Sequence, residues 1–478
     1  MGKVLRWLSW FHRWTGVGLC LLFLLWFASG AILLFVPFPS LGDKDRLAGS
    51  ERFDPAAIAI APGQALATAG GGEGLRLVSV AGAPRYVIQG VDGALKTIDA
   101  RGGRIAPELT ADQARTIAQR FAGVGVKRVS APIRYDQWVV HNRFDPWRPF
   151  FKVSLADRAG TELYVSAKTG EVMQRTRRAE RAWNWGGAVI HWLYFTALRR
   201  SFAAWDQTVW WVSLLGVTTA AIGIFLGIYR TQKRMQGRKP DWSPFRGWLR
   251  WHHGLGLGAA VFVLTWIVSG WLSMDHGRLF SRGVAAEEAA SRYHGQALDQ
   301  ALAGAPASRL AALGPTSSIV FGVVGGHPVA AAEDGRTSRV RLLDGDAASV
   351  TPTLPRDLLL SAARSAWPIS TAPAAKDDDA LYRTAEGMAP RTIRLPLDRP
   401  TGSAVYLDPV TGHVVSVMDP SRKAYAWIYY ALHTFNFPVL IDRPVLRKVI
   451  VLIPLLLGLM FSWTSLVVAI KRVRLSAA

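Results

Sequence analysis

Cysteine is almost absent from this chain, since Cys20 is the only one among 478 residues. A lone cysteine excludes a disulfide framework, a cysteine-ligated zinc or iron–sulfur centre, and a CxxCH site for covalently attached c-type haem. Any metal or cofactor must therefore be held by other side chains, and the ten histidines are the first candidates.

Acidic residues are also scarce: 34 Asp and Glu stand against 56 Lys and Arg, which gives a formal net charge of +22. Such a charge can indicate a nucleic-acid partner. Here the densest basic clusters instead flank long apolar segments, where the positive-inside rule of membrane proteins places them. We therefore expect membrane lipid and no nucleic acid among the partners, with a weaker basic bias elsewhere that would steer anionic ligands.

Apolar residues make up half of the chain and 20 residues are Trp, a composition more typical of a membrane protein than of a soluble enzyme. Four stretches reach membrane-spanning length almost without charge: 15–36, 209–229, 255–274 and 449–470. They predict four transmembrane helices. We expect the first to be retained, because its apolar run is too long for a signal peptide and no small-x-small cleavage site follows.

The short connections and the chain ends carry thirteen basic residues against one acidic residue, Asp241. These cations are Lys3, Arg6, Arg13, Arg230, Lys233, Arg234, Arg238, Lys239, Arg246, Arg250, Lys471, Arg472 and Arg474. Both termini and the middle loop are therefore expected in the cytoplasm, and the long segments 37–208 and 275–448 outside.

The two halves of the sequence repeat each other. The stretch "WLSWFHRWTGVG" at 7–18 has a near twin, "WLRWHHGLGLG", at 248–258. An offset of 240 residues pairs His12 with His252, Gly16 with Gly256, and Ser29-Gly30 with Ser269-Gly270. An offset of 242 pairs "VIHWLYF" (189–195) with "ALHTFNF" (431–437), and so His191 with His433.

The sequence of each half therefore predicts the same order of elements: a helix leaving the cytoplasm, an external α+β domain, an aromatic segment with a histidine, and a returning helix. The expected fold is an α-helical membrane protein with four transmembrane helices in two parallel repeats, related by an axis along the membrane normal, plus two external domains. The predicted boundaries are helix 1 at 1–36, the first external domain at 37–182, a histidine-bearing segment with helix 2 at 183–235, a loop with helix 3 at 236–276, the second external domain at 277–424, and a histidine-bearing segment with helix 4 at 425–478.

The external segments show the patterns of small α+β units. Residues 84–105 alternate like a hairpin, and 110–123 read as a helix with a threonine N-cap. Residues 150–178 return to strands around a Thr-Gly turn, and 339–367 with 391–418 repeat the theme in the second half.

The duplicated histidines suggest haem chemistry. His12 and His252 open helices on the cytoplasmic side, while His191 and His433 precede the returning helices on the external side. A bis-histidine b-type haem needs two neutral imidazoles that approach the iron from opposite sides. One symmetric pair near each membrane face predicts two haem b groups. The four histidines would be the ligands of the metal, the haem iron.

The duplicated glycines extend this prediction. Residues i and i+4 share a helix face, so Gly16 and Gly256 clear space beside His12 and His252. Gly30 follows His12 by five turns, roughly 27 Å along the same face, and Gly270 repeats the relation. We predict a porphyrin niche at each pair.

Alternatives remain at this point. Interfacial histidines often belong to an aromatic belt, and small residues in membrane helices often serve packing alone. His253 could replace His252 as the ligand, but we prefer His252 because it preserves the His-x-x-x-Gly spacing. His276 could serve as a ligand or a proton relay. Arginines near the expected haem edges could bind propionates or simply flank the membrane: Arg13, Arg199, Arg200, Arg443 and Arg447. Four histidines without matched partners are expected on the surface: His141, His294, His327 and His413.

These stretches resemble a known family. Residues 12–30 and 252–270 are similar to the His-x-x-x-Gly…Ser/Thr-Gly helix of the PepSY-associated transmembrane family, and "YLDPVTGHVVSV" at 406–417 is similar to the closing strand of a PepSY domain. The resemblance implies a multi-pass protein of the bacterial inner membrane, with haem in the membrane and PepSY-like domains in the periplasm. It also implies reduction of ferric siderophores, as in reductases of the ferrioxamine reductase kind, with ligand-type histidines at His12, His252, His191 and His433.

Two departures limit this resemblance. The first PepSY-like strand, "YVSAKTGEV", lacks the usual Asp-Pro, and the external segments are long, so substrate specificity does not carry over. Only about eight residues follow the fourth apolar stretch, so we expect electrons from a quinol or a separate cytoplasmic donor rather than from a fused flavin domain.

Three functions compete. The first is an oxidoreductase that reduces a ferric chelate at an aromatic docking surface made of Trp185, Trp192, Tyr425, Trp427, Tyr429 and Tyr430. The second is a non-catalytic binding or regulatory protein with PepSY-like domains. The third is a transporter of siderophore or haem, since duplicated membrane repeats are common in transporters. The sequence assigns no catalytic residue for the reduction itself.

Overall fold

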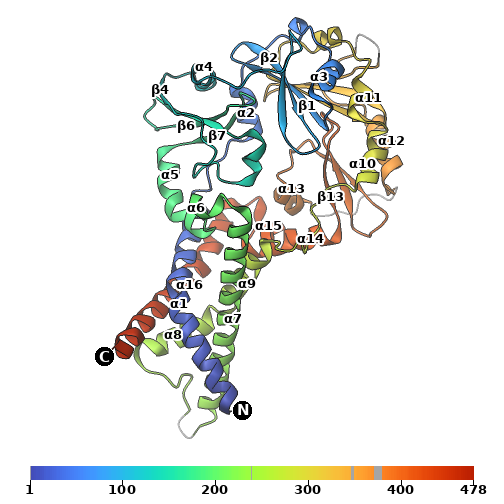
Figure 1. The fold of residues 1–478 in the computed structure, drawn as a ribbon. Helices are drawn as coiled ribbons and strands as arrows, with labels where there is room; N and C mark the ends of the chain where they lie inside the picture. The colour runs from blue at the N-terminus through green and yellow to red at the C-terminus, as the bar shows by residue number, and fades with distance from the viewer. Residues whose placement is uncertain (1, 238–239, 346–348, 371–378, 478) are drawn as a thin grey trace.

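The computed structural model describes residues 2–237, 240–345, 349–370 and 379–477, so Arg238 and Lys239 lie outside the described residues. A bundle of long helices carries β-sheet domains at one end, and both chain termini lie at the other (Figure 1). We call these two ends the sheet side and the termini side.

Among the described residues, three helices are long and apolar enough to cross a membrane: α1 (Gly2–Phe35), α7 (Phe202–Met235) and α16 (Pro444–Ala477). A fourth crossing is formed only if α8 (Gly247–Gly258) and α9 (Ala260–Ser273) count as one span. These segments agree with a membrane protein of several spans.

The third predicted helix, at 255–274, is not continuous. It breaks at Ala259, and α8 and α9 meet at an angle of 66°. Glycines at 254, 256 and 258 weaken the helix before the break, because glycine has the largest conformational freedom. The Trp242 ring fills the space beside Gly254, where a Cβ would lie 2.9 Å from it, and so ties α8 to the preceding loop.

The bundle repeats one packing contact between the two halves. A Cβ at Gly458 on α16 would overlap the Phe27 ring of α1, and a Cβ at Gly216 on α7 would lie 2.6 Å from Ile267 of α9. Gly216 and Gly458 are related by the offset of 242, and Phe27 and Ile267 by that of 240. Each glycine thus accepts a large side chain from the other half of the chain.

The sheet side contains three antiparallel sheets. In the first half, β4 (Val126–Val129), β5 (Phe150–Leu155), β6 (Glu162–Ser166) and β7 (Val172–Thr176) form one sheet beside α4 (Ala111–Ala122). In the second half, β11 (Ile393–Pro396), β12 (Ala404–Leu407) and β13 (Val414–Met418) form another, and α12 is Arg356–Ala366. Thr110 caps α4 in a capping box, which confirms the predicted N-cap.

The third sheet is shared by both halves. Its strand order is β10-β9-β8-β1-β2-β3, with β1 at Gly74–Val80, β2 at Ala83–Gln89, β3 at Leu95–Asp99, β8 at Ser318–Val324, β9 at His327–Glu333 and β10 at Ser338–Leu342. The hairpin predicted at 84–105 is β2 with β3. Strand β1 pairs with β8, Leu77 opposite Ile319, and one buried core contains Leu77, Tyr86 and Phe321. The two predicted external domains are therefore joined by backbone hydrogen bonds.

Shorter elements complete the chain: α2 (Asp43–Gly49), η1 (Pro55–Ala57), α3 (Pro62–Ala69), η2 (Asn142–Trp147), α5 (Arg178–Asn184), η3 (Trp185–Val189), α6 (Thr196–Arg199), α10 (Glu287–His294), α11 (Leu298–Leu302), η4 (Ala307–Leu313), α13 (Ala380–Glu386), α14 (Pro420–Ala426), η5 (Trp427–His433) and α15 (Pro438–Ile441). Segments η3 and η5 are π-helical turns, which occur often at functional sites.

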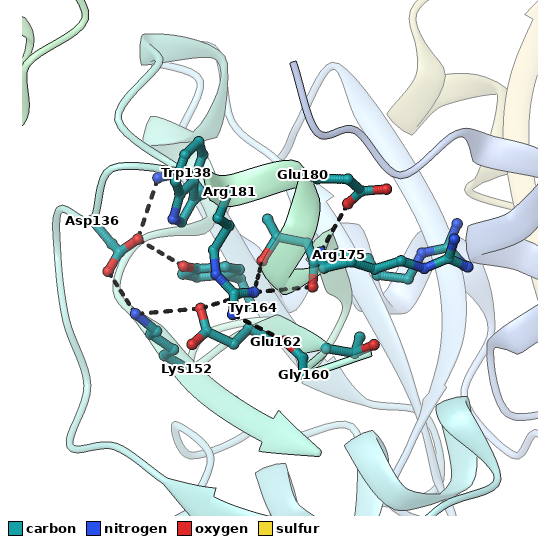
Figure 2. A network of polar contacts seen from close by, with 12 residues as sticks. Asp136, Trp138, Lys152, Gly160, Glu162, Tyr164, Arg175, Glu180 and Arg181 are labelled. Carbon is teal, nitrogen blue, oxygen red and sulfur yellow. Dashed lines mark hydrogen bonds and ion pairs between the residues drawn. The ribbon is translucent and has the colours of Figure 1, made fainter. Parts of the chain in front are cut away.

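A polar network connects α5 to the four-stranded sheet β4-β5-β6-β7 (Figure 2). The network thereby also holds the part of the chain that leads to His191. Tyr164 donates to Asp136 at 2.6 Å, and Lys152 bridges Asp136 and Glu162 at 3.1 and 3.4 Å. Arg181 of α5 donates to Thr176 Oγ1 and lies 3.5 Å from Glu162. The second half repeats the tyrosine contact, because Tyr406 donates to Asp379.

The glycine contacts give a test of bundle packing. Gly458→Ala should lower the free energy of unfolding by about 1–3 kcal/mol, because its Cβ overlaps the Phe27 ring. Gly18→Ala is the matched control, since nothing lies within 4 Å of a Cβ there. Thermal unfolding in detergent measures both variants, and equal midpoints would contradict the proposed close contact.

Candidate functional site

The four duplicated histidines lie in pairs along the bundle. His191 follows η3 and His433 ends η5, both on the sheet side, and their ring centres are 6.2 Å apart at an interplanar angle of 61°. His12 on α1 and His252 on α8 lie toward the termini side and line the same cavity. We call these the outer pair and the inner pair.

Serine hydroxyls set the tautomer of the outer pair. Ser29 Oγ donates to the Trp26 carbonyl at 3.1 Å and lies 3.0 Å from His191 Nδ1. Because a hydroxyl has one hydrogen, the ring must carry the proton on Nδ1 and donate it to Ser29. Ser269 repeats this arrangement, with its hydroxyl on the Trp266 carbonyl and its oxygen 3.1 Å from His433 Nδ1. In its neutral form each outer ring therefore keeps a lone pair on Nε2.

In the inner pair Nδ1 also faces an oxygen, but the partners differ from those of the outer pair. His12 Nδ1 lies 3.0 Å from the Thr219 carbonyl, which can only accept. His252 Nδ1 lies 3.2 Å from Ser465 Oγ, whose hydrogen goes to the Phe461 carbonyl. Within the described parts of the chain, no hydrogen bond reaches Nε2 of any of the four rings. A metal-ligating histidine has this form, with one nitrogen free and the other N–H oriented by an oxygen.

Burial favours the neutral form of both outer rings. Burial lowers the pKa of His191 to about 3, and the nearby His433 acts in the same direction. Burial likewise lowers the pKa of His433 to about 4. Neutral imidazole is the form that binds a metal.

His253 differs from His252 in every contact. Its Nδ1 accepts from Ser243 at 2.8 Å, and its Nε2 lies 3.1 Å from the Gly227 carbonyl, to which it must donate. The ring is buried and stacks on Trp242 at 5.9 Å and 11°. Both nitrogens are thus used within the protein, which makes His253 a packing residue and leaves His252 as the ring with a free nitrogen.

A cavity of about 700 Å³ lies at the inner pair, within the range of about 300–1,000 Å³ that is usual for small-molecule and cofactor sites. Gly16 lies in its wall, and nothing occupies the 4 Å around a Cβ there. Its lining residues include no Asp or Glu but five cations, namely Arg13, Arg230, Arg246, Lys471 and Arg472. The cavity therefore suits a largely apolar ligand with anionic groups.

The other predicted glycines lie against side chains of the protein. A Cβ at Gly30 would lie 3.5 Å from His191 Cε1, and one at Gly270 would lie 3.1 Å from His433 Cε1. A Cβ at Gly256 would lie 3.0 Å from the Phe461 ring, on which His252 stacks. Gly30 and Gly270 thus make room for the imidazoles themselves, a different role from the open niche predicted for them.

Backbone strain repeats after each outer histidine. Leu193 has φ 51° and Phe435 has φ 56°, and the two are related by the offset of 242. A bulky residue at positive φ costs about 1–3 kcal/mol, and such residues cluster at functional sites. The turn that follows each outer histidine is therefore held in place by its surroundings.

The predicted docking aromatics are not equivalent in the two halves. Tyr429 stacks on His433 at 5.7 Å, and Tyr425 lies 6.0 Å beyond it. The residue that corresponds to Tyr429 in the first half is Gly187, which packs against Ile32. Tyr430 adjoins Tyr429 at 4.9 Å, Trp192 packs on Tyr194, and Trp185 and Trp427 are exposed.

The five predicted arginines have different surroundings. Arg13 lines the cavity, and Arg447 donates to the Thr434 carbonyl beside His433 at 2.8 Å. Arg199 is buried, donates to Asn142 at 2.9 Å and lies over the Trp205 ring. Arg200 and Arg443 are exposed.

Sequence reasoning missed the oxygens that orient the rings. The repeated Ser29 and Ser269 stand beside the duplicated glycines and were a readable signal, whereas Thr219 and Ser465 differ between the halves. It also missed Asp206, which accepts from His276 Nδ1 at 2.6 Å. His276 is therefore bound to Asp206 and not to either histidine pair.

A comparison with protein families gives one match. The model described as the PepSY-associated TM region matches residues 9–472. No protein of curated function matches the chain.

The contrast between His252 and His253 can be measured. His253→Ala should lower the free energy of unfolding by about 1–3 kcal/mol, because it leaves buried polar groups at Ser243 and Gly227 without their partner. His252→Ala should cost about 1 kcal/mol or less, since one hydrogen bond is lost. Denaturant unfolding in detergent compares the two, and a larger loss for His252→Ala would contradict the assignment.

Proposed function

The chain belongs to the PepSY-associated transmembrane family, and from this premise we propose that it is a haem-carrying oxidoreductase of the bacterial inner membrane that reduces the iron of ferric siderophores in the periplasm. In this proposal the bent pair α8–α9 is the third of four spans, the termini side faces the cytoplasm and the sheet side faces the periplasm. The basic residues of the termini side support that orientation.

One observation carries the proposal: four half-buried histidines in two pairs all place Nδ1 against an oxygen and leave Nε2 without a hydrogen-bond partner among the described residues. In the described residues no group of three His, Cys, Asp or Glu side chains could hold a metal ion. Two imidazoles suffice only for a metal that brings its other ligands, as porphyrin iron does. This favours b-type haem over a bare metal centre.

At the inner pair a cavity and its cations fit that group, and at the outer pair the spacing of the two rings does. The inner cavity of about 700 Å³ holds His12 and His252, with the cations of its wall available to propionates. Two imidazoles on opposite faces of one metal have ring centres about 6 Å apart, because each metal–nitrogen bond is about 2 Å. The outer pair, at 6.2 Å, agrees with that spacing. Bound haem would supply a one-electron carrier at each position.

The substrate and the electron donor are proposed from the same layout. Tyr425 and Tyr429 form an aromatic surface on the sheet side that leads to His433, suitable for stacking against a chelate. Trp427, in the same segment, is exposed. Reduction to Fe²⁺ weakens binding by hard oxygen donors and frees the iron. The donor on the termini side is a quinol or a separate cytoplasmic protein.

Two rival functions make different predictions. A transporter would use the bend between α8 and α9 and would rock one repeat against the other. The six-stranded sheet opposes such rocking, because it joins the halves through the ladder of β1 and β8. Uptake of labelled siderophore into proteoliposomes would favour the transporter. A regulatory protein with helices as anchors would tolerate alanine at all four histidines.

Optical spectra of the purified protein test the proposal. We expect Soret and α bands that respond to dithionite, and two haem groups per chain by pyridine haemochrome. His12→Ala and His252→Ala should each remove one haem, and His191→Ala and His433→Ala the other. His327→Ala is the control, because His327 lies in the shared sheet and pairs with Asp344. Absence of the bands from purified protein would refute the proposal.

A further inference from the structure

A half-buried acid–histidine pair lies on the sheet side, outside both histidine pairs. His276, just after α9, contacts Asp206 in the second turn of α7 at 2.6 Å, and the two side chains are 25% and 14% exposed. Since a carboxylate accepts, His276 donates from Nδ1 and its Nε2 can carry an exchangeable proton. The ring also packs against Trp210 at 4.8 Å with an interplanar angle of 35°, so its orientation is set on two sides.

The loop around His276 is strained and clamped. Asp275 and Arg278 both have positive φ, 49° and 56°. Asp275 Oδ1 accepts from the Phe280 N–H at 3.0 Å, and Phe280 packs on Tyr425 at 5.5 Å. Tyr425 in turn donates to the Ser273 carbonyl at 3.3 Å, before His276 in sequence. Both ends of the loop are therefore fixed to Tyr425.

Tyr425 links this loop to the outer pair. Ring contacts run from Tyr425 to Tyr429 at 6.0 Å and from Tyr429 to His433 at 5.7 Å. These residues are not repeated at the matching positions of the other half. The first half has Trp183 and Gly187 at the positions of Tyr425 and Tyr429, while the positions that match Asp206 and His276 are Lys448 and Val36. The arrangement belongs to one side of the pseudo-symmetric bundle.

The charged neighbours leave Asp206 as the direct partner of the ring. On the same loop, Asp275 lies 3.9 Å from Arg282, and Arg278 follows. From α14, Arg422 lies over Tyr425 and pairs with Glu386 at 2.7 Å. Each of these acids has a basic partner of its own.

We propose that His276, held by Asp206, is the general acid that protonates the chelate as its iron is reduced at the aromatic surface. This inference rests on the proposed function and adds the proton donor to it. The reduced protein supplies one electron to Fe³⁺, and the proton on Nε2 passes to the chelate oxygen as its bond to iron breaks. Fe²⁺ leaves, and neutral His276 regains a proton from water on the sheet side.

The test uses dithionite-reduced full-length protein, freed of excess reductant and mixed without oxygen with a ferric trihydroxamate. Two rates are followed: reoxidation of the protein in the visible spectrum, and capture of released Fe²⁺ by ferrozine. His276→Gln keeps a donor for Asp206 but cannot pass on a proton, so iron release should slow by about 100-fold. The rate of iron release by the wild type should depend on pH, as general acid catalysis requires, and the variant should lose that dependence.

Controls separate this role from a structural one. Reoxidation by ferricyanide releases no ligand, and it should be equal in wild type and His276→Gln. Asp206→Asn should slow iron release with the same loss of pH dependence, while His327→Gln, which alters the acid–histidine pair of the shared sheet, should leave the rate unchanged. A wild-type rate and pH profile in His276→Gln would overturn the inference alone, and so would equal slowing with ferricyanide. Wild-type protein that the chelate cannot reoxidise would overturn the proposed function and this inference with it.

Discussion

Each of the four duplicated imidazoles donates its Nδ1–H to one oxygen, and much of the fold serves to put that oxygen in place. A buried N–H without an acceptor costs about 1–3 kcal/mol, so the ring rotates to where the acceptor is and the second nitrogen points elsewhere. Ser29 and Ser269 are held on α1 and α9 by bonds to their own helices. The glycines that follow them let each outer ring approach the helix, and the strained turns at Leu193 and Phe435 bring the ring there.

The same constraint explains why the sheets matter to a site in the bundle. The network of Asp136, Tyr164 and Arg181 fixes α5, and α5 leads directly to the segment of His191. In the second half, Tyr406 and Asp379 make the corresponding contact. Both halves also share a six-stranded sheet. The two segments that carry the outer pair are therefore both attached to one common support.

Much of this could be predicted from the sequence because the duplication preserves it. The long apolar helices, the hairpin, the capped helix and the pairing of His191 with His433 follow from periodicity and from the two offsets. The bend between α8 and α9 could not, since glycine-rich stretches in membrane helices are compatible with straight packing as well. The preference for His252 over His253 rested on spacing alone, whereas the contacts of Ser243 and Gly227 with His253 now give its physical reason. Asp206 lies seventy residues from His276 and has no counterpart in the other half, so no repeat pointed to it.

The ladder between β1 and β8 also bears on how the chain is made. Strand β1 ends at Val80 and its partner begins at Ser318, so roughly 240 residues are synthesised between them. At about 5–20 residues per second, the edge of β1 waits about 10–50 s for its partner, with unpaired backbone groups open to other chains. The six-stranded sheet is thus completed only after α9 has been made, and biogenesis has a long interval in which a chaperone would find an exposed strand.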